Sequence, residues 1–244
     1  MRRLLPWLLA AWLPCAGAHE PDWSAYRALL GAHVSRGERH GVTLNVVDYA
    51  GLRADPRLGE AIAAVETFPT SRLANRDERI AFLVNVYNLY TLALVARHWP
   101  LDSIKDIGSL LRPVWKRPAG QLDGKAVTLD EIEHAQLRTL GEPRIHFAIV
   151  CASVSCPDLR PEPYMAATLD AQLDDQAKTF LANPAKGLRR EADTWRASRI
   201  FDWFEDDFEP AGGVAAFIAR FQPLPRDAEV DADLPYDWGI NARP

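Results

Sequence analysis

Residues 145–157 (IHFAIVCASVSCP) bring a histidine, two cysteines and two serines into one short segment. Branched and aromatic residues open the segment and predict a strand, which then turns before Pro157. If the mature protein begins at His19, Cys151 and Cys156 are its only cysteines. Histidine beside two thiols is suited to nucleophilic thiol chemistry, a disulfide or a metal site.

The two cysteines are predicted to differ in reactivity. Alternation along a strand places His146 and Cys151 on opposite faces, so Cys151 is expected to be a small buried side chain. Cys156 precedes Pro157, a residue favoured at the first position of a helix, which makes Cys156 a candidate N-cap. Unpaired N–H groups at a helix start lower the pKa of a thiol. Cys156 is therefore expected to be the more reactive thiol.

A catalytic cysteine also needs a group that accepts its proton. His146 or His134 is the candidate base for attack by Cys156 or Cys151. Glu133 is a candidate to orient a histidine, although direct neighbours on a helix face different ways. For Glu133 and His134 a structural pair is the favoured interpretation.

Two asparagines lie in the middle of an apolar stretch. Asn85 and Asn88 are three positions apart and share one face of a predicted buried helix. A buried amide is costly unless it is hydrogen-bonded. Either they supply an oxyanion donor or orient a histidine, or they bond to neighbouring backbone, and the sequence leaves both interpretations open.

Three other chemistries compete with the Cys–His site. A Cys151–Cys156 disulfide would close a small loop and stabilise the fold by roughly 2 kcal/mol. A zinc site has suitable ligand types, but their spacing matches no common zinc pattern, so neither a metal nor a cofactor is expected. Ser153 and Ser155 lack the G-x-S-x-G setting of a serine hydrolase. The zinc ligands considered are His134, His146, Cys151 and Cys156.

The elements that must position these residues are mostly helical. Asn75 is a plausible N-cap for a long buried helix over 76–98, which ends before Pro100. Asp123-Gly124 predicts the turn of a hairpin within 113–127, and Thr128 to Glu131 fits a capping box that opens a helix to about residue 140. The other predicted elements are helices at 23–33, 57–67, 165–181 and 213–221 and from 202, with strands at 42–49 and 195–200.

This pattern predicts an α+β fold: a predominantly helical single domain with a small sheet that carries the His146–Cys151 strand. Residues 19–68 are interpreted as an N-terminal helical extension and residues 69–241 as the main domain. The chain has 244 residues, enough for a substantial core.

The N-terminus resembles an export signal. Arg2 and Arg3 precede an apolar run over 4–13, and Ala16-Gly17-Ala18 is a cleavage motif, so residues 1–18 are predicted to be a signal peptide. Pro14 makes Cys15 a poor lipid anchor. The protein is expected to be periplasmic or secreted after cleavage following Ala18, with no stable membrane insertion afterwards.

Charge limits the class of partner. The formal net charge is −5, and loss of residues 1–18 moves it to about −7 on the same counting. This excess of acidic over basic residues does not indicate a basic surface, which argues against nucleic acid as a partner. An unknown small molecule or peptide is the expected partner.

Several motifs together resemble a known family. Residues 81–88 (AFLVNVYN), 129–134 (LDEIEH) and 146–157 (HFAIVCASVSCP) are similar, in order, to three signatures of the domain of unknown function 547 family. The resemblance covers most of 45–241 and is densest from about 69 to 181. Leu83 stands where this family commonly has tryptophan. The family brings no established activity with it.

The sequence therefore yields two hypotheses. The first is an exported domain whose Cys–His site acts on an amide, thioester or thiol-containing small molecule or peptide. The alternative is a non-catalytic periplasmic binding or scaffold domain with a structural Cys151–Cys156 disulfide.

Overall fold

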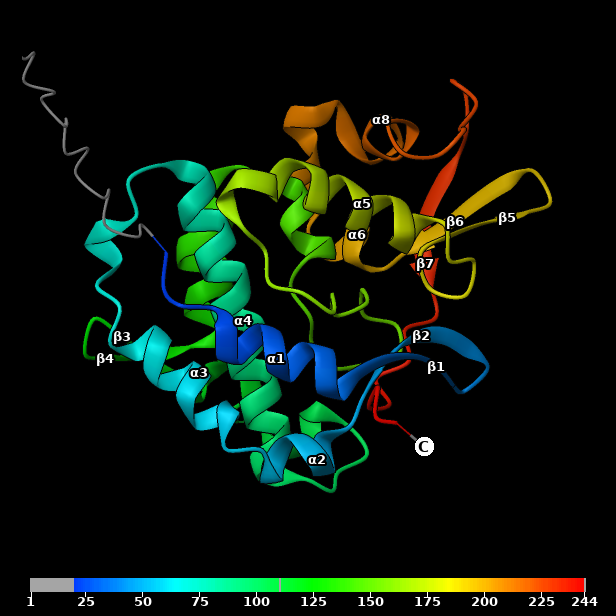
Figure 1. Cartoon of the computed structure of the whole chain (residues 1–244). Coiled ribbons are helices and arrows are strands. Elements are labelled where there is room, and N and C mark those ends of the chain that lie inside the picture. The colour runs from blue at the N-terminus through cyan, green and yellow to red at the C-terminus, as the bar shows by residue number, and fades with distance from the viewer. Residues whose placement is uncertain (1–19, 110, 244) are drawn as a thin grey trace, which may run out of the picture.

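Helix α4 (Arg76–His98) runs through the centre of the computed structural model, which describes residues 20–109 and 111–243 (Figure 1). The Asn75 side chain accepts a hydrogen bond from the Glu78 N–H, and the helix ends before Trp99, as the sequence predicts. All residues over 80–96 are buried. A helix that is apolar on every side needs neighbours on every side, so the other elements surround it.

Helix α4 also has the length and apolar character of a membrane span, which the sequence analysis did not expect after the signal peptide. In its most apolar stretch, 94% of the residues are buried inside the fold. The core helix of a folded domain has the same properties.

The N-terminal elements share the core of α4. They are α1 (Ser24–His33), β1 (Val34–Arg39), β2 (Val42–Val47), α2 (Tyr49–Ala54) and α3 (Arg57–Glu66). Strands β1 and β2 form an antiparallel hairpin. Side chains of α1 and α3 belong to the same hydrophobic core as α4, so the predicted extension packs directly on the domain that follows it.

A second hairpin leads to the segment that carries Glu133 and His134. Strands β3 (Pro118–Leu122) and β4 (Lys125–Thr128) are joined at Asp123 and Gly124, which both have positive φ angles, as a tight hairpin turn requires. The Thr128 hydroxyl accepts from the Glu131 N–H, and the Glu131 carboxylate accepts from the Thr128 N–H, which confirms the predicted capping box. A π-helix over Glu131–Leu137 follows.

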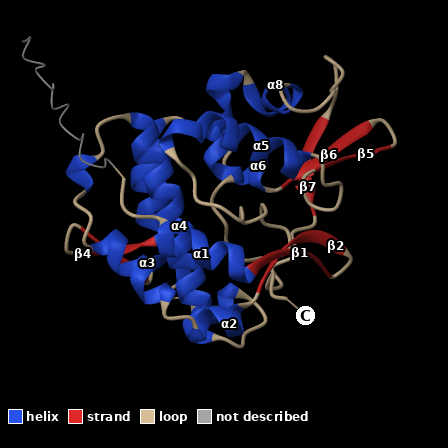
Figure 2. Ribbon diagram, viewed as in Figure 1, coloured by secondary structure: helices blue, strands red, loops and turns tan. Residues whose placement is uncertain are grey.

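The C-terminal part forms a second apolar cluster. Helix α5 (Leu169–Leu181) and α8 (Gly213–Ala219) lie beside a sheet in which β6 pairs antiparallel with β5 and parallel with β7 (Figure 2). Phe147 packs among the aromatic side chains of this cluster. The remaining elements are β5 (Leu188–Glu191), β6 (Thr194–Ser198), α6 (Ile200–Trp203), α7 (Glu205–Phe208) and β7 (Val230–Leu234). Helices with three small sheets confirm the α+β class.

The predicted His146–Cys151 strand is wrong. A 3-10 helix covers Pro143–Phe147, and the backbone then turns. Side-chain amides satisfy this backbone in place of a neighbouring strand: Asn88 bonds the Ala148 carbonyl and the Val150 N–H. The run of branched residues reflects burial on all sides, which a strand and a buried turn share.

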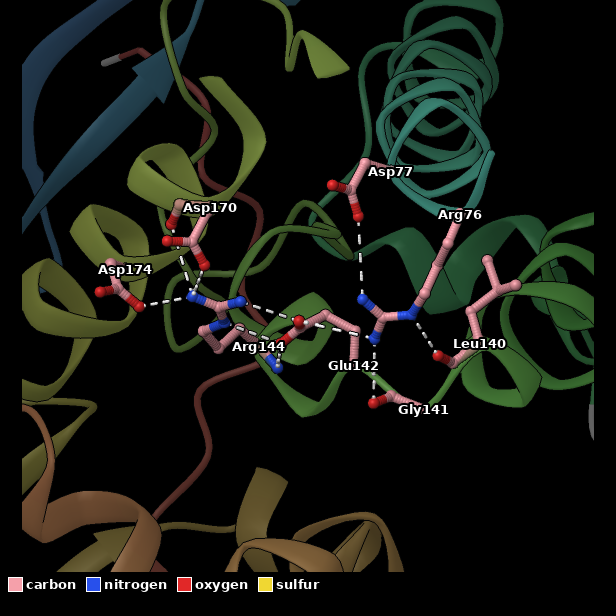
Figure 3. A network of polar contacts seen from close by, with 8 residues as sticks. All are labelled: Arg76, Asp77, Leu140, Gly141, Glu142, Arg144, Asp170 and Asp174. Carbon is pink, nitrogen blue, oxygen red and sulfur yellow. Dashed lines mark hydrogen bonds and ion pairs between the residues drawn. The ribbon is translucent and has the colours of Figure 1, made fainter. Parts of the chain in front are cut away.

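An ion-pair network fixes the 3-10 helix in place (Figure 3). The Arg144 guanidinium lies at its centre and is 2.7 Å from Glu142, 2.8 Å from Asp170 and 2.6 Å from Asp174. Arg76, the first residue of α4, adds a hydrogen bond to the Leu140 carbonyl. The 3-10 helix that carries His146 is thereby tied to both α4 and α5.

Candidate thiol site

A cavity of about 400 Å³ opens beside Cys151 and Cys156. We call it the thiol cavity. Its buried side chains include Tyr87, Glu133 and His146, and exposed side chains such as Lys116 and His134 lie where it meets solvent. The candidate residues Glu133, His134 and His146 thus share one cavity with both cysteines.

Cys151 is the half-exposed cysteine and has several hydrogen-bonding neighbours. Its Sγ lies 3.0 Å from the Ser153 Oγ and 3.3 Å from the Tyr236 hydroxyl. Its backbone N–H donates to the Cys156 Sγ at 2.8 Å. The next residue, Ala152, has a φ of 59°, in the left-handed region that non-glycine residues seldom adopt. Such strain is often found at functional sites.

These contacts shift the two thiol pKa values in opposite directions. The hydrogen bond from Cys156 lowers the pKa of Cys151; burial opposes this, and donors from Ser153 and Tyr236 reinforce it. Burial raises the pKa of Cys156 well above its usual value, and the hydrogen bond to Cys151 raises it further. The direction of these shifts is opposite to the order that the sequence predicts, and it favours the thiolate at Cys151 over one at Cys156.

The expected helix start at Cys156 is also absent, because residues 157–163 form no helix and α5 begins only at Leu169. Cys156 is instead buried in the core. Its carbonyl accepts a hydrogen bond from the buried Lys186 Nζ at 2.6 Å, and Lys186 also pairs with Asp158 at 2.5 Å. Both cysteines are free thiols, so the disulfide considered above is not formed in this structure.

His146 is held by a chain of charged groups. Its Nε2 lies 2.7 Å from the Asp207 Oδ2, and Arg138 makes two hydrogen bonds to the same carboxylate. The ring stacks on Phe204 with centroids 4.0 Å apart. Burial lowers the pKa of His146, against the pull of Asp207. The lowered pKa favours the neutral ring, and a neutral ring that bonds to Asp207 directs its Nε2 proton at that carboxylate.

This arrangement fixes the tautomer of His146. When Nε2 carries the proton, Nδ1 carries a lone pair. Within residues 20–109 and 111–243, the buried Nδ1 atom has no hydrogen-bond partner. Because Nδ1 is buried, a ligand in the thiol cavity would reach this acceptor only after neighbouring side chains move.

Glu133 is the second proton-exchanging group in the wall. The Tyr87 hydroxyl donates to the Glu133 carboxylate at 3.2 Å, and burial raises the pKa of Glu133 to about 7. Its neighbour His134 is exposed and lies 3.0 Å from Arg138. Glu133 therefore pairs with Tyr87 and not with His134. Both residues lie on the π-helix, a geometry frequently found at functional sites.

The two asparagines serve the backbone. Asn85 accepts from the Tyr164 N–H and donates to its carbonyl. Asn88 makes the equivalent pair of bonds to Ala148 and Val150. Neither lines the thiol cavity. Asn88 nevertheless positions the turn that ends at Cys151, so its role is to hold the site in place.

The C-terminal segment completes the cavity, and sequence reasoning missed its part. The Val154 N–H donates to the Gly239 carbonyl and the Ser155 N–H to that of Asp237, which brings Tyr236 and Trp238 to the cavity wall. Asp207, the partner of His146, was also missed. The motif Tyr236-Asp237-Trp238, two aromatic residues in an otherwise polar tail, was the available signal.

The structure groups no metal ligands. Among the described residues, no three His, Cys, Asp or Glu side chains are placed to hold a metal ion. This arrangement supports chemistry in which a thiol of lowered pKa reacts beside two titratable groups, His146 and Glu133.

Comparison with known proteins finds a similarity to one protein family. Neither the curated proteins nor the solved structures contain a match to this chain. Residues 71–181 match the family described as "Protein of unknown function, DUF547", and they include α4, the π-helix, His146 and both cysteines. By this match, residues 71–181, a little under half of the chain, are similar to the DUF547 family.

Proposed function

We propose that the protein is a thiol-dependent acyl transferase or hydrolase in which Cys151 attacks the carbonyl carbon of an amide or thioester. One observation carries the proposal: a thiol with a lowered pKa shares its cavity with His146 and with a carboxyl group whose pKa is near 7. Catalysis near neutral pH needs an ionised nucleophile and a group that can exchange a proton.

The reaction divides into two balanced steps. The Cys151 thiolate forms a bond to the carbonyl carbon, the bond to the leaving amine or thiol breaks, and the protonated Glu133 supplies the proton that the leaving group takes. Water then attacks the Cys151 acyl thioester and gives its proton to the Glu133 carboxylate. Release of the acid restores the thiolate.

The competing function is a non-catalytic binding or scaffold domain. That hypothesis relied on a structural disulfide, whereas both cysteines are free and have opposite pKa shifts. A buried thiol that served only packing would need no donors directed at its sulfur. The observed donors favour the nucleophile.

The test combines alkylation with a chromogenic ester. Iodoacetamide should modify Cys151 in the folded protein and leave Cys156 unmodified, as read by peptide mass spectrometry. p-Nitrophenyl acetate should give a burst of nitrophenolate that matches the protein concentration. Cys151→Ser should abolish the burst, and Cys156→Ser should retain it. Preferential labelling of Cys156, or a burst that survives Cys151→Ser, contradicts the proposal.

We further propose that this chemistry takes place after export, in the periplasm or outside the cell, on a small molecule or peptide. The basis is the signal-like sequence of residues 1–18, which lies outside the residues that the structure describes. N-terminal sequencing of the exported protein should begin at His19. A mature protein that retains residues 1–18, or that is lipidated at Cys15, contradicts this proposal.

A further inference from the structure

The wall of the thiol cavity is rich in aromatic rings. Trp203, Tyr236 and Trp238 contact one another, with centroids 4.5 to 5.7 Å apart. Trp115 meets Trp238 edge to face at 5.8 Å, and Phe204 covers one face of His146. Trp203 and Phe204 lie at the end of α6, Tyr236 and Trp238 lie in the C-terminal segment, and Trp115 lies in a 3-10 helix over Val114–Lys116. All five rings line the thiol cavity together with Cys151.

Most polar groups of the cavity interior already have partners. Glu133 bonds to Tyr87, His146 bonds to Asp207, and the Tyr236 hydroxyl lies between Cys151 and Ser153. A hydroxyl-rich ligand such as a sugar would have to break these bonds or leave its own groups unpaired, which is costly. An alkyl chain needs only apolar surface, and its burial is favourable.

The charges lie at the rim. Lys116 and His134 are exposed, and Asp130 is half-buried beside them. A substrate with an apolar part and a polar leaving group therefore matches the cavity in both regions. The volume of about 400 Å³ is within the range of roughly 300 to 1,000 Å³ that small-molecule sites have.

We propose that the thiol cavity selects substrates in which an alkyl or other apolar acyl chain adjoins the reacting carbonyl, as in a fatty-acyl thioester or amide. This inference rests on the proposed function of Cys151. The acyl chain lies against the aromatic rings while the thiolate bonds to the carbonyl carbon. The bond from that carbon to the leaving thiol or amine breaks, and the leaving group takes the proton of Glu133.

A series of acyl thioesters tests this specificity. S-acyl N-acetylcysteamines from acetyl to octanoyl differ only in chain length. Acylation of Cys151, followed by intact mass and by release of the free thiol, should accelerate up to about fourfold per methylene, the factor equivalent to ~0.8 kcal/mol per buried CH₂. The increase should level off when the chain fills the cavity.

Two tryptophan variants locate the effect. Trp203→Ala removes a ring from the cavity wall and should flatten the dependence on chain length. Trp195→Ala is the matched control, because Trp195 lies on β6 against the second apolar cluster and outside the cavity wall. It should keep the wild-type dependence. Melting curves of both variants confirm that each is folded.

The outcomes separate this inference from the proposed function. Equal rates for all chain lengths, or stronger competition by an N-acetyl sugar than by an alkyl amide, overturn the acyl-chain inference. If iodoacetamide still labels Cys151 in that case, the nucleophile proposal stands alone. If Cys151 reacts with neither iodoacetamide nor any thioester, the proposed function fails and the inference fails with it.

Discussion

At the scale of single residues, the neighbours of each sulfur decide which cysteine reacts. Cys151 and Cys156 are both close to apolar core. The Cys156 sulfur accepts one backbone N–H, whereas Ser153, Tyr236 and the other cysteine all lower the pKa of Cys151. A thiolate is stabilised by hydrogen bonds to its charged form, and a buried thiol without them stays protonated. Cys156 is thus a donor to its neighbour rather than a second nucleophile.

Cys156→Ala should raise the pKa of Cys151, because the hydrogen bond from Cys156 is the largest cause that lowers it. The rate of alkylation by iodoacetamide, measured from about pH 5 to about pH 9, should show its midpoint at higher pH than in the wild type. Cys156→Ser keeps a donor and should shift the midpoint less. Identical midpoints in the wild type and Cys156→Ala would contradict the role of this hydrogen bond.

Glu133 makes a second residue-scale prediction, about stability. Its pKa rises from 4.5 to about 7 on folding, mainly through burial. The folded state then binds more protons than the unfolded state between these values, so its stability falls as the pH rises through this window. Glu133→Gln mimics the neutral acid, so the stability of this variant should not fall through this pH window.

Denaturation with urea across this pH range measures the effect. The variant and the wild type should be similar near pH 4.5. The variant should be more stable above pH 7, by on the order of 3 kcal/mol, which is the full pKa shift converted to free energy. A constant difference at all pH values would show that burial of Glu133 does not carry a raised pKa.

At the scale of elements, the long helix α4 supports the site through amides on one face. Asn85 and Asn88 each satisfy two backbone groups of buried loops. Loss of an amide leaves those groups unpaired, at a cost of about 1 to 3 kcal/mol for each. Only Asn88 holds the turn next to Cys151.

The two asparagine variants should therefore differ in one respect. Asn85→Leu and Asn88→Leu should both lower the melting temperature, but only Asn88→Leu should slow labelling of Cys151 below the melting transition. Thermal unfolding and iodoacetamide kinetics measure the two effects. Slower labelling in both variants, or in neither, would contradict a specific positioning role for Asn88.

The elements also show what the sequence can predict. The 76–98 helix, the turn at Asp123-Gly124 and the Thr128–Glu131 capping box depend on local signals, and the structure confirms all three. The segment from His146 to Cys151 depends on a distant side chain, Asn88, that replaces a partner strand. Local pattern shows that this segment is buried and leaves its conformation undetermined.

At the scale of the whole molecule, the site is assembled from residues inside the family match and from residues beyond it. Residues 71–181 supply Glu133, His146 and Cys151. Asp207 and Tyr236, which tune the histidine and the thiol, come from later in the chain. The motif in the cysteine segment identifies the region of the nucleophile. The groups that set the pKa of the thiol and of the histidine are neighbours only in the folded structure, and they have no fixed spacing from the motif along the sequence.

Backbone hydrogen bonds hold the C-terminal segment against the turn that follows Cys151. The Asn241 N–H donates to the Ala152 carbonyl, and the Asn241 side chain accepts a bond from the buried Tyr49 hydroxyl at 2.7 Å. Asn241→Leu removes this anchor without touching the thiol cavity. Hydrogen exchange at the Val154 and Ser155 amides should become faster, because their acceptors lie on the loosened segment.

Labelling of Cys151 should also slow in Asn241→Leu, since Tyr236 moves with the segment and its hydroxyl is one of the donors that lower the thiol pKa. Arg243→Ala is the matched control: Arg243 is exposed, and among the described residues its side chain binds Ser35 and Asp48, so both readouts should stay at wild-type values. A melting curve confirms that each variant is folded. If Asn241→Leu destabilises the protein yet leaves exchange at Val154 and labelling at Cys151 unchanged, the C-terminal segment contributes stability alone and has no part in tuning the thiol.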